Sequence, residues 1–176
     1  VAHPAKAIVA ATGLVDDPGQ GRVGMGRIEQ ARNIEGWRVT RLLDIGVENF
    51  LLSSTVRGIL AQRLVRVICP ACKEVDLQTM NTEEFQALGI DGNAVLYRGQ
   101  GCEKCSQTGY YGRTGIFELL LVTDEVRKMI VKKVDANQIR NVAIEQGMRT
   151  LSEDGIRKVT AGRTTLGEVL RVTQEI

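Results

Sequence analysis

Four cysteines in two matched pairs most constrain what this chain can fold into. Cys69 and Cys72 form one C-x-x-C pair, Cys102 and Cys105 form the other, and twenty-nine residues separate them. Two residues between cysteines let both thiolates point at one centre from a single tight turn. Two such turns supply the four sulfurs of a closed tetrahedral zinc site. Because four cysteines leave no open position for water, the spacing predicts a structural metal and not a catalytic one. The glycines that favour a close chain reversal beside the second pair are Gly101 and Gly109.

Other uses of four cysteines fit the rest of the sequence less well. No cysteine is left without a partner pair, and we find no signal peptide and no apolar run long enough to span a membrane, so a secreted disulfide framework is disfavoured. A redox C-x-x-C normally occurs once, near a strand–helix junction, and not twice. Iron stays open as an alternative to zinc, because four thiolates also suit an iron centre.

The composition narrows the chemistry further. The chain has 176 residues, 43% hydrophobic and 25% charged, which is typical of a soluble globular protein of one domain with at most a small appendage. Its single histidine, His3, disfavours histidine-based catalysis and mixed cysteine–histidine metal sites. A net charge of +2 and 4% aromatic residues argue against a zinc-ribbon nucleic-acid binder, which we keep as an alternative. The modest basic cluster beside the first pair, typical of a solvated rim, is Arg63, Arg66 and Lys73.

No convincing nucleotide-binding loop is present. A literal G-x-G-x-x-G occurs at Gly19, Gly21 and Gly24, with Asp44 twenty residues beyond. The dinucleotide fingerprint needs a strand immediately before it and a helix opening at its third glycine, whereas here a loop precedes it and Gly24-Met25-Gly26 is a poor helix start. The phosphate-cradling G-x-x-x-x-G-K-[ST] does not occur, so the sequence offers no P-loop.

Apolar periodicity, caps and glycine stops predict an α+β fold. Helix caps are expected at Asn81, Asp135 and Thr165, with Glu168 as the capping-box partner of Thr165. The expected strands cover residues 7–11, 64–68, 94–98 and 116–121. The expected helices cover residues 38–44, 50–60, 81–88, 124–133, 135–147, 151–161 and 165–172. The last four are short and amphipathic, and we expect them to form one compact helical subdomain packed on the cysteine module. The expected divisions are residues 1–36, a glycine-rich segment without assignment, then 37–68, then 69–112 around the cysteines, then 113–176.

Several stretches follow one another in an order that a known family shares. They are residues 39–44 and 45–48, 60–66 running into 69–72, 101–105 leading to GYYGRTGIFELL at 109–120, and finally 151–155 and 164–170. On these motifs, residues 39–176 resemble the C-terminal part of the type II secretion assembly ATPases, the general secretion pathway protein E family. They are also similar, less closely, to the type IV pilus assembly ATPases. The resemblance covers about four-fifths of the chain.

The resemblance implies a specific biology. Members are bacterial ATPases with a RecA-like motor domain, usually hexameric, located in the cytoplasm and peripheral to the inner membrane. They drive pseudopilus assembly and so protein export, with the other subunits of the ring and inner-membrane secretion platform proteins as partners. Nucleic acid is not implied, and the membrane is reached only through partners. By resemblance, residues 37–68 are the end of the RecA-like motor, 69–112 a tetracysteine zinc module with Cys69, Cys72, Cys102 and Cys105 as ligands, and 113–176 a small helical bundle.

The chain departs from the family before residue 39. The family's Walker A loop, Asp box, Walker B segment and His box all precede the similar region, and Ile34-Glu35-Gly36-Trp37 does not fit the place of the His box. ATP and Mg²⁺ therefore belong to the complete family protein. We assign no catalytic or cofactor-binding residue here and expect no ATPase activity from this chain alone. The pattern fits a fragment, a degraded gene product, a fusion or an engineered chain.

Alternatives to an inactive module stay open. A nucleotide site completed by residues 1–36 or by another chain is one of them. For Arg63, at the end of the motor-like stretch, a nucleotide contact in a complete ATPase is weighed against a structural role.

Overall fold

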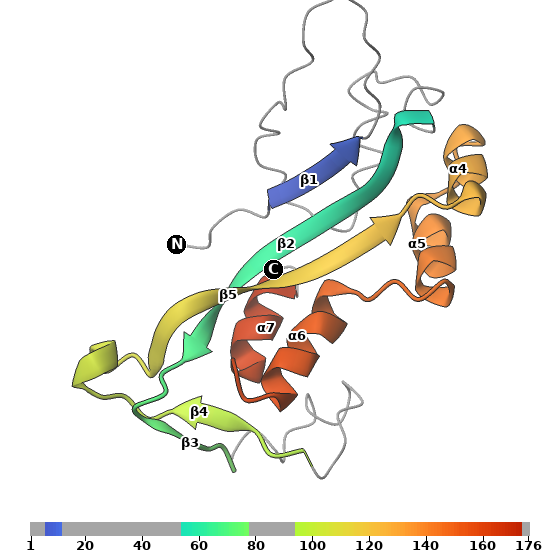
Figure 1. Ribbon diagram of the computed structural model, residues 1–176. Helices are drawn as coiled ribbons and strands as arrows, with labels where there is room; N and C mark the ends of the chain where they lie inside the picture. Colours follow the sequence, from blue (N-terminus) through green and yellow to red (C-terminus); the bar gives the residue numbers. More distant parts are fainter. Residues whose placement is uncertain (1–5, 12–53, 78–93, 174–176) are drawn as a thin grey trace, which may run out of the picture. The chain divides into compact units, whose positions relative to one another are not determined.

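The structure, a computed structural model, describes residues 6–11, 54–77 and 94–173 (Figure 1). These residues form a mixed fold of helices and small sheets, as the sequence predicts. The strands are β1 (Lys6–Ala11), β2 (Val56–Ile68), β3 (Lys73–Val75), β4 (Tyr97–Gly99) and β5 (Tyr110–Leu121). The helices are α4 (Asp124–Val131), α5 (Ala136–Glu145), α6 (Leu151–Thr160) and α7 (Leu166–Thr173), with a short 3₁₀ helix, η2 (Glu103–Cys105). None of the helices in these ranges has the length and apolar character that a membrane crossing requires.

The strands form two sheets. β1, β2 and β5 lie in that order in a three-stranded sheet, and β3 pairs with β4 antiparallel, with Glu74 opposite Arg98. β2 and β5 are antiparallel, because Val122 N donates to Arg57 O (3.0 Å) near one end and Cys69 N donates to Gly109 O (2.9 Å) beyond the other. This pairing brings the segments that carry the two cysteine pairs to the same end of the ladder.

The two long strands correct the sequence prediction. The helix expected over residues 50–60 is wrong, since residues 56–60 belong to β2. A short apolar run does not separate helix from strand by periodicity, and β5, about sixty residues later, supplies the backbone partners that decide it. Gly58 disfavours a helix. It suits the sheet, because a side chain there would crowd β5: a Cβ would lie 3.2 Å from Leu120 O. The strands expected at 64–68 and 116–121 are present and longer, and the strand expected at 94–98 is β4, about two residues later. The helices expected at 38–44 and 81–88 lie outside the described residues.

One compact unit, which we call the apolar unit, contains the described residues 6–11, 54–61 and 118–149. Its core joins β2 and β5 to α4 and α5 through a continuous set of buried side chains. These are Val56, Ile59, Leu120, Val122, Val126, Ile130, Ala136, Ile139, Ala143 and Met148. α4 and α5 begin at side-chain caps, with Thr123 Oγ1 accepting from Val126 N and Asp135 Oδ1 accepting from Asn137 N. The cap at Asp135 is the one that the sequence predicts.

The other compact unit, the cysteine unit, contains the described residues 62–77, 94–117 and 150–173. α6 and α7 pack tightly because Gly155 has no side chain where Val169 sits; a Cβ there would lie 2.4 Å from Val169 Cγ1. α6 begins at a capping box between Thr150 and Glu153 that sequence reasoning missed. The four helices thus fall into two pairs in different units, whereas the sequence predicts one helical subdomain. The domain boundaries expected at residues 36, 68 and 112 stay predictions.

Candidate metal centre

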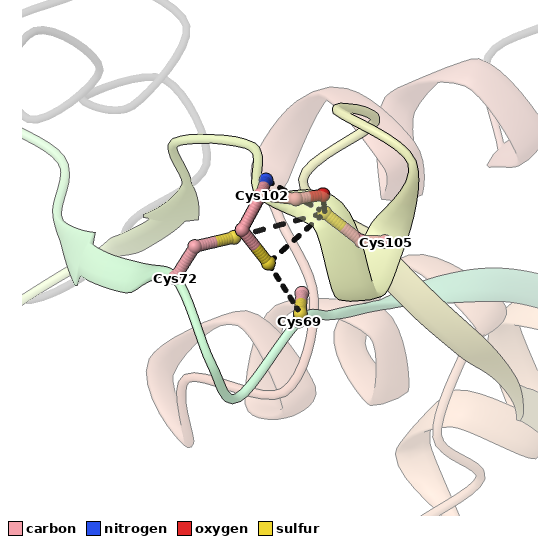
Figure 2. A group of neighbouring side chains, drawn as sticks. All are labelled: Cys69, Cys72, Cys102 and Cys105. Carbon is pink, nitrogen blue, oxygen red and sulfur yellow. Dashed lines mark hydrogen bonds between the residues drawn. The ribbon is translucent and has the colours of Figure 1, made fainter.

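The first cysteine turn follows directly from β2. Cys69 comes after Ile68, the last residue of that strand, and is fully buried. Cys72 N donates to Cys69 O (3.3 Å), which closes the turn, and β3 begins at the next residue. The turn therefore connects a strand of the larger sheet to the β3–β4 hairpin, and both of its thiols face the same side (Figure 2).

The second turn is the 3₁₀ helix η2. Cys105 N and Gln107 N both donate to Cys102 O, at 3.2 and 2.9 Å, so the chain winds tightly around the second pair. Ser106 and Gln107 then adopt left-handed conformations, with φ of 51° and 61°. Gly101 and Gly109, on either side, have φ of 104° and 75°, which confirms the chain reversal that the sequence predicts there.

A close backbone contact holds the second turn against β4. A Cβ on Gly99 would lie 1.9 Å from Gly109 O, so only glycine permits this approach. Gly109 O in turn accepts from Cys69 N, and Gln100 N donates to Cys72 O (3.0 Å). Backbone hydrogen bonds therefore connect each cysteine turn to the segment that carries the other pair. Sequence reasoning missed Gly99, and a glycine directly after the expected strand 94–98 is the signal that could have found it.

All four predicted cysteines come together. Their sulfur atoms lie within 4.8 Å of one another. Three of the separations are 3.7 Å (Cys102–Cys105), 3.8 Å (Cys72–Cys105) and 3.9 Å (Cys69–Cys102) (Figure 2). Four sulfurs about 2.3 Å from one tetrahedral centre would be about 3.8 Å apart. The same distances exceed the ~2.05 Å of a disulfide bond, and all four thiols are free. The geometry therefore fits one tetrahedral metal ion.

Backbone N–H groups point at two of the sulfurs. Cys105 Sγ accepts from Cys102 N (3.2 Å) and from Gly109 N (3.3 Å), and Cys72 Sγ accepts from Gly101 N (3.3 Å). Hydrogen bonds to the charged form of a ligand offset the negative charge that four thiolates bring to one metal. The backbone N–H groups of these loops are therefore placed to stabilise deprotonated sulfurs.

These contacts shift the pKa values of the thiols in opposite directions. Burial raises the pKa of Cys105, but the N–H groups of Cys102 and Gly109 lower it more strongly, to about 6. Burial raises the pKa of Cys72 to about 12, and the N–H of Gly101 offsets only part of this increase. Metal ligation requires deprotonated cysteine, so filling the site releases protons and metal affinity falls as the pH is lowered.

Two residues of the predicted basic rim beside the first turn make side-chain contacts that the sequence does not predict. Arg66 Nη2 donates to Glu168 Oε1 (2.7 Å), and its guanidinium lies 4.1 Å from the centre of the Tyr110 ring. Lys73 Nζ donates to Gly162 O (2.7 Å). Two members of the rim are therefore bound to other parts of the cysteine unit. Arg63 is half-buried in β2.

Glu168 is a buried carboxylate that the sequence assigns to a helix cap. Its N–H does donate to Thr165 Oγ1 (3.3 Å), as a cap predicts, but its carboxylate binds Arg66 N, the Arg66 guanidinium and Arg171 instead. Burial raises the pKa of Glu168, and the hydrogen bonds and charges of both arginines outweigh burial and lower it to about 2. Glu168 thus joins α7 to β2 just before the first cysteine turn.

Comparison with known proteins gives a consistent result. The sequence profile of a family described as "Type II/IV secretion system protein" matches residues 32–171, so the similarity begins earlier than the expected residue 39 and includes residues 34–37. The chain is 48% identical over 139 residues to "Type II secretion system protein E" of Pseudomonas aeruginosa, covering 78% of the chain and 27% of that protein. It is 46% identical over 140 residues to "Type IV pilus assembly ATPase PilB" of Thermus thermophilus, covering 78% of the chain and 16% of that protein. It is 44% identical over 141 residues to "Type II secretion system ATPase E" of Vibrio cholerae, covering 78% of the chain and 27% of that protein. The chain spans about a quarter or less of the length of these relatives.

Proposed function

Because this chain belongs to the type II/IV secretion system protein family, we propose that it is the zinc-binding C-terminal part of a secretion or pilus assembly ATPase. In this proposal the chain is a structural and interaction element that acts with a motor, and it hydrolyses no ATP by itself. Cys69, Cys72, Cys102 and Cys105 are the zinc ligands. The observation that carries the proposal is the convergence of all four sulfurs to within 4.8 Å at separations that suit one tetrahedral ion.

Zinc is the metal that we favour for this site. Four cysteine thiolates close the coordination sphere, so the ion would have no position for water or substrate and would act by holding the two turns together. The backbone N–H groups on Cys72 and Cys105 support a thiolate cluster of high negative charge. Iron has the same ligand preference, and the two metals are told apart by light absorption, since zinc is colourless.

We also propose that this chain continues from a motor domain in the complete protein. Residues 37–68 would be the end of a RecA-like domain whose remaining part binds ATP and Mg²⁺ in the complete protein. Residues 69–112 would form the zinc module and 113–176 the helical remainder. We propose a cytoplasmic location peripheral to the inner membrane. The partners would be other subunits of a hexameric ring and the inner-membrane secretion platform. The names of the relatives, which include a type II secretion ATPase and a type IV pilus assembly ATPase, support the presence of an ATPase motor in the complete protein.

Elemental analysis of the purified chain tests the metal assignment. We expect one zinc per chain without visible absorption, and loss of that zinc in variants with serine at Cys69 or Cys72. A chain that carries no metal when purified with zinc present, or that carries coloured iron, would contradict the zinc assignment.

A titration with ATP and Mg²⁺ tests whether the chain lacks a nucleotide site of its own. We expect no saturation up to millimolar ATP. Saturable binding at micromolar ATP would show that the chain holds a nucleotide site after all and would replace the structural role with an enzymatic one.

A further inference from the structure

The first cysteine turn is tied at both ends to the connection between α6 and α7. Ile68, just before Cys69, donates its N–H to Arg163 O (3.0 Å). Lys73, just after Cys72, donates from Nζ to Gly162 O (2.7 Å). Two consecutive carbonyls of the helix connection therefore bracket the four residues that carry the first two thiols. All of these residues belong to the cysteine unit.

The ammonium group of Lys73 occupies a site shaped to receive it. It lies 4.1 Å from the centre of the Tyr97 ring, and Tyr97 is paired with Val75 across the β3–β4 hairpin. Gly162 is buried with φ of 64°, and a Cβ there would lie 2.5 Å from Lys73 Nζ and 2.7 Å from Tyr97 Cδ2. The ring face and the carbonyl thus offer the ammonium a cation–π contact and a hydrogen bond together. Lys73 is exposed as a whole residue, so these two contacts, and not burial, hold its ammonium group in place.

The helix connection is itself fixed to β2 and β5. The fully buried Thr164 donates from Oγ1 to Arg66 O (2.7 Å), and the hydroxyls of Tyr110 and Thr165 are 2.8 Å apart. Glu168, at the start of α7, binds the backbone and side chain of Arg66. The carbonyls at residues 162 and 163 therefore belong to a segment that side-chain hydrogen bonds fix to β2 and β5, and Lys73 links that segment to the Cys72 end of the turn.

We infer that Lys73 is a positioning residue of the metal centre, which sets Cys72 in place through Gly162 and couples metal binding to the α6–α7 connection. The inference rests on the proposed zinc site. Groups that orient metal ligands without touching the metal contribute about 10- to 100-fold to metal affinity. Coupling is reciprocal, so the metal must protect the connection by the same factor that the connection contributes to metal binding.

The test compares lysine variants by their zinc affinity, measured in competition with a chelating dye. We expect Lys73→Met to bind zinc about 10-fold more weakly than the wild type. Lys73→Arg keeps a donor and a cation over Tyr97, and we expect it to recover most of the affinity. Lys104→Met is the matched control, because Lys104 adjoins Cys105 as Lys73 adjoins Cys72, and its ammonium lies over Tyr111 and makes no bond to the helix connection. We expect it to change the affinity by less than about 2-fold.

Hydrogen exchange gives the reciprocal readout. Removing zinc from the wild type should speed exchange in residues 162–166 about 10-fold more than in Lys73→Met, where the tie is already broken. Gly162→Ala, which displaces the ammonium from the other side, tests the same contact with Lys73 intact. Equal zinc affinity in Lys73→Met and wild type, or an equal loss in Lys104→Met, would overturn the inference while leaving the zinc site in place. A wild-type chain that binds no zinc would overturn both.

Discussion

The two units of this chain are stabilised in different ways. The apolar unit has one continuous cluster of buried aliphatic side chains from two strands and two helices. The cysteine unit also buries aliphatic residues, but it contains the four thiols and most of the buried polar side chains among the described residues: Asp76, Thr150, Thr164 and Glu168. Apolar burial is non-directional and tolerates small shifts, whereas thiolates around a metal and a buried carboxylate depend on exact partners. Loss of metal and loss of apolar contacts should therefore affect different units.

Removing a central ligand should have the largest effect. Cys105 is 5% exposed and accepts two backbone hydrogen bonds at its sulfur. We expect Cys105→Ser to lose stoichiometric zinc. The variant would then also lose the contribution of zinc binding to the folding free energy, on the order of 10 kcal/mol in small zinc-dependent folds. Metal analysis and the far-ultraviolet circular dichroism spectrum check this. Ser106→Ala, at the exposed neighbouring residue, should keep both metal and structure. Full zinc retention by Cys105→Ser would contradict the ligand assignment.

A cavity in the apolar unit should lower the stability of that unit and leave metal binding unchanged. Leu120 is fully buried in the apolar cluster. We expect Leu120→Ala to lower the free energy of unfolding of its unit by about 3–5 kcal/mol, through lost burial and an unfilled cavity. Leu121→Ala is the matched control, because that side chain is 58% exposed, and it should change stability by about 0.5 kcal/mol or less. Zinc per chain should stay at one in both variants, and loss of zinc in Leu120→Ala would show that the two units are not independent in this respect.

The buried carboxylate gives the cysteine unit a pH dependence. The folded pKa of Glu168 is about 2, below its ordinary value of 4.5, so the ionised carboxylate stabilises the fold. The stabilisation is complete above about pH 4.5 and is lost as the pH falls toward 2. We expect Glu168→Gln to cost about 3 kcal/mol near pH 7, because it removes a buried partner of two arginines.

The variant should also flatten the acid limb of the stability curve, measured by urea unfolding between pH 2 and 6. Glu145→Gln, on the exposed end of α5, should leave that limb unchanged. An acid limb as steep in Glu168→Gln as in the wild type would assign the pH dependence to other groups.

The close backbone approach at the second turn should have a smaller effect. A Cβ at Gly99 would meet Gly109 O at 1.9 Å, so Gly99→Ala must move β4 away from the turn. We expect a loss of about 2 kcal/mol of stability and weaker zinc binding. Gly167→Ala is the control, since a Cβ there meets nothing within 4 Å on α7, and it should stabilise by about 0.5–1 kcal/mol. Thermal unfolding of the zinc-loaded proteins measures both, and equal melting temperatures would contradict the close packing.

The sequence predicts what depends on local pattern. The C-x-x-C spacing indicates that the four thiols share one site, and the cap at Asp135 marks the start of α5 correctly, because turn and cap chemistry act over a few residues. Local pattern could not identify residues 56–60 as part of a strand, because the strand that pairs with them, β5, is distant in the sequence. For the same reason the sequence indicates only a solvated rim for Lys73 and a helix cap for Glu168, and not their long-range contacts. Their partners, Gly162 and Arg66, are 89 and 102 residues away.

Hydrogen–deuterium exchange on the purified chain, zinc-loaded and after chelation, tests most directly whether a metal holds the cysteine unit. We predict that chelation removes protection from β3, β4 and the α6–α7 connection while α4 and α5 keep theirs, because the metal holds the cysteine unit and aliphatic packing holds the other. Unchanged protection throughout the described residues, or equal loss in both units, would contradict the claim that a metal on four cysteines organises one unit of this protein.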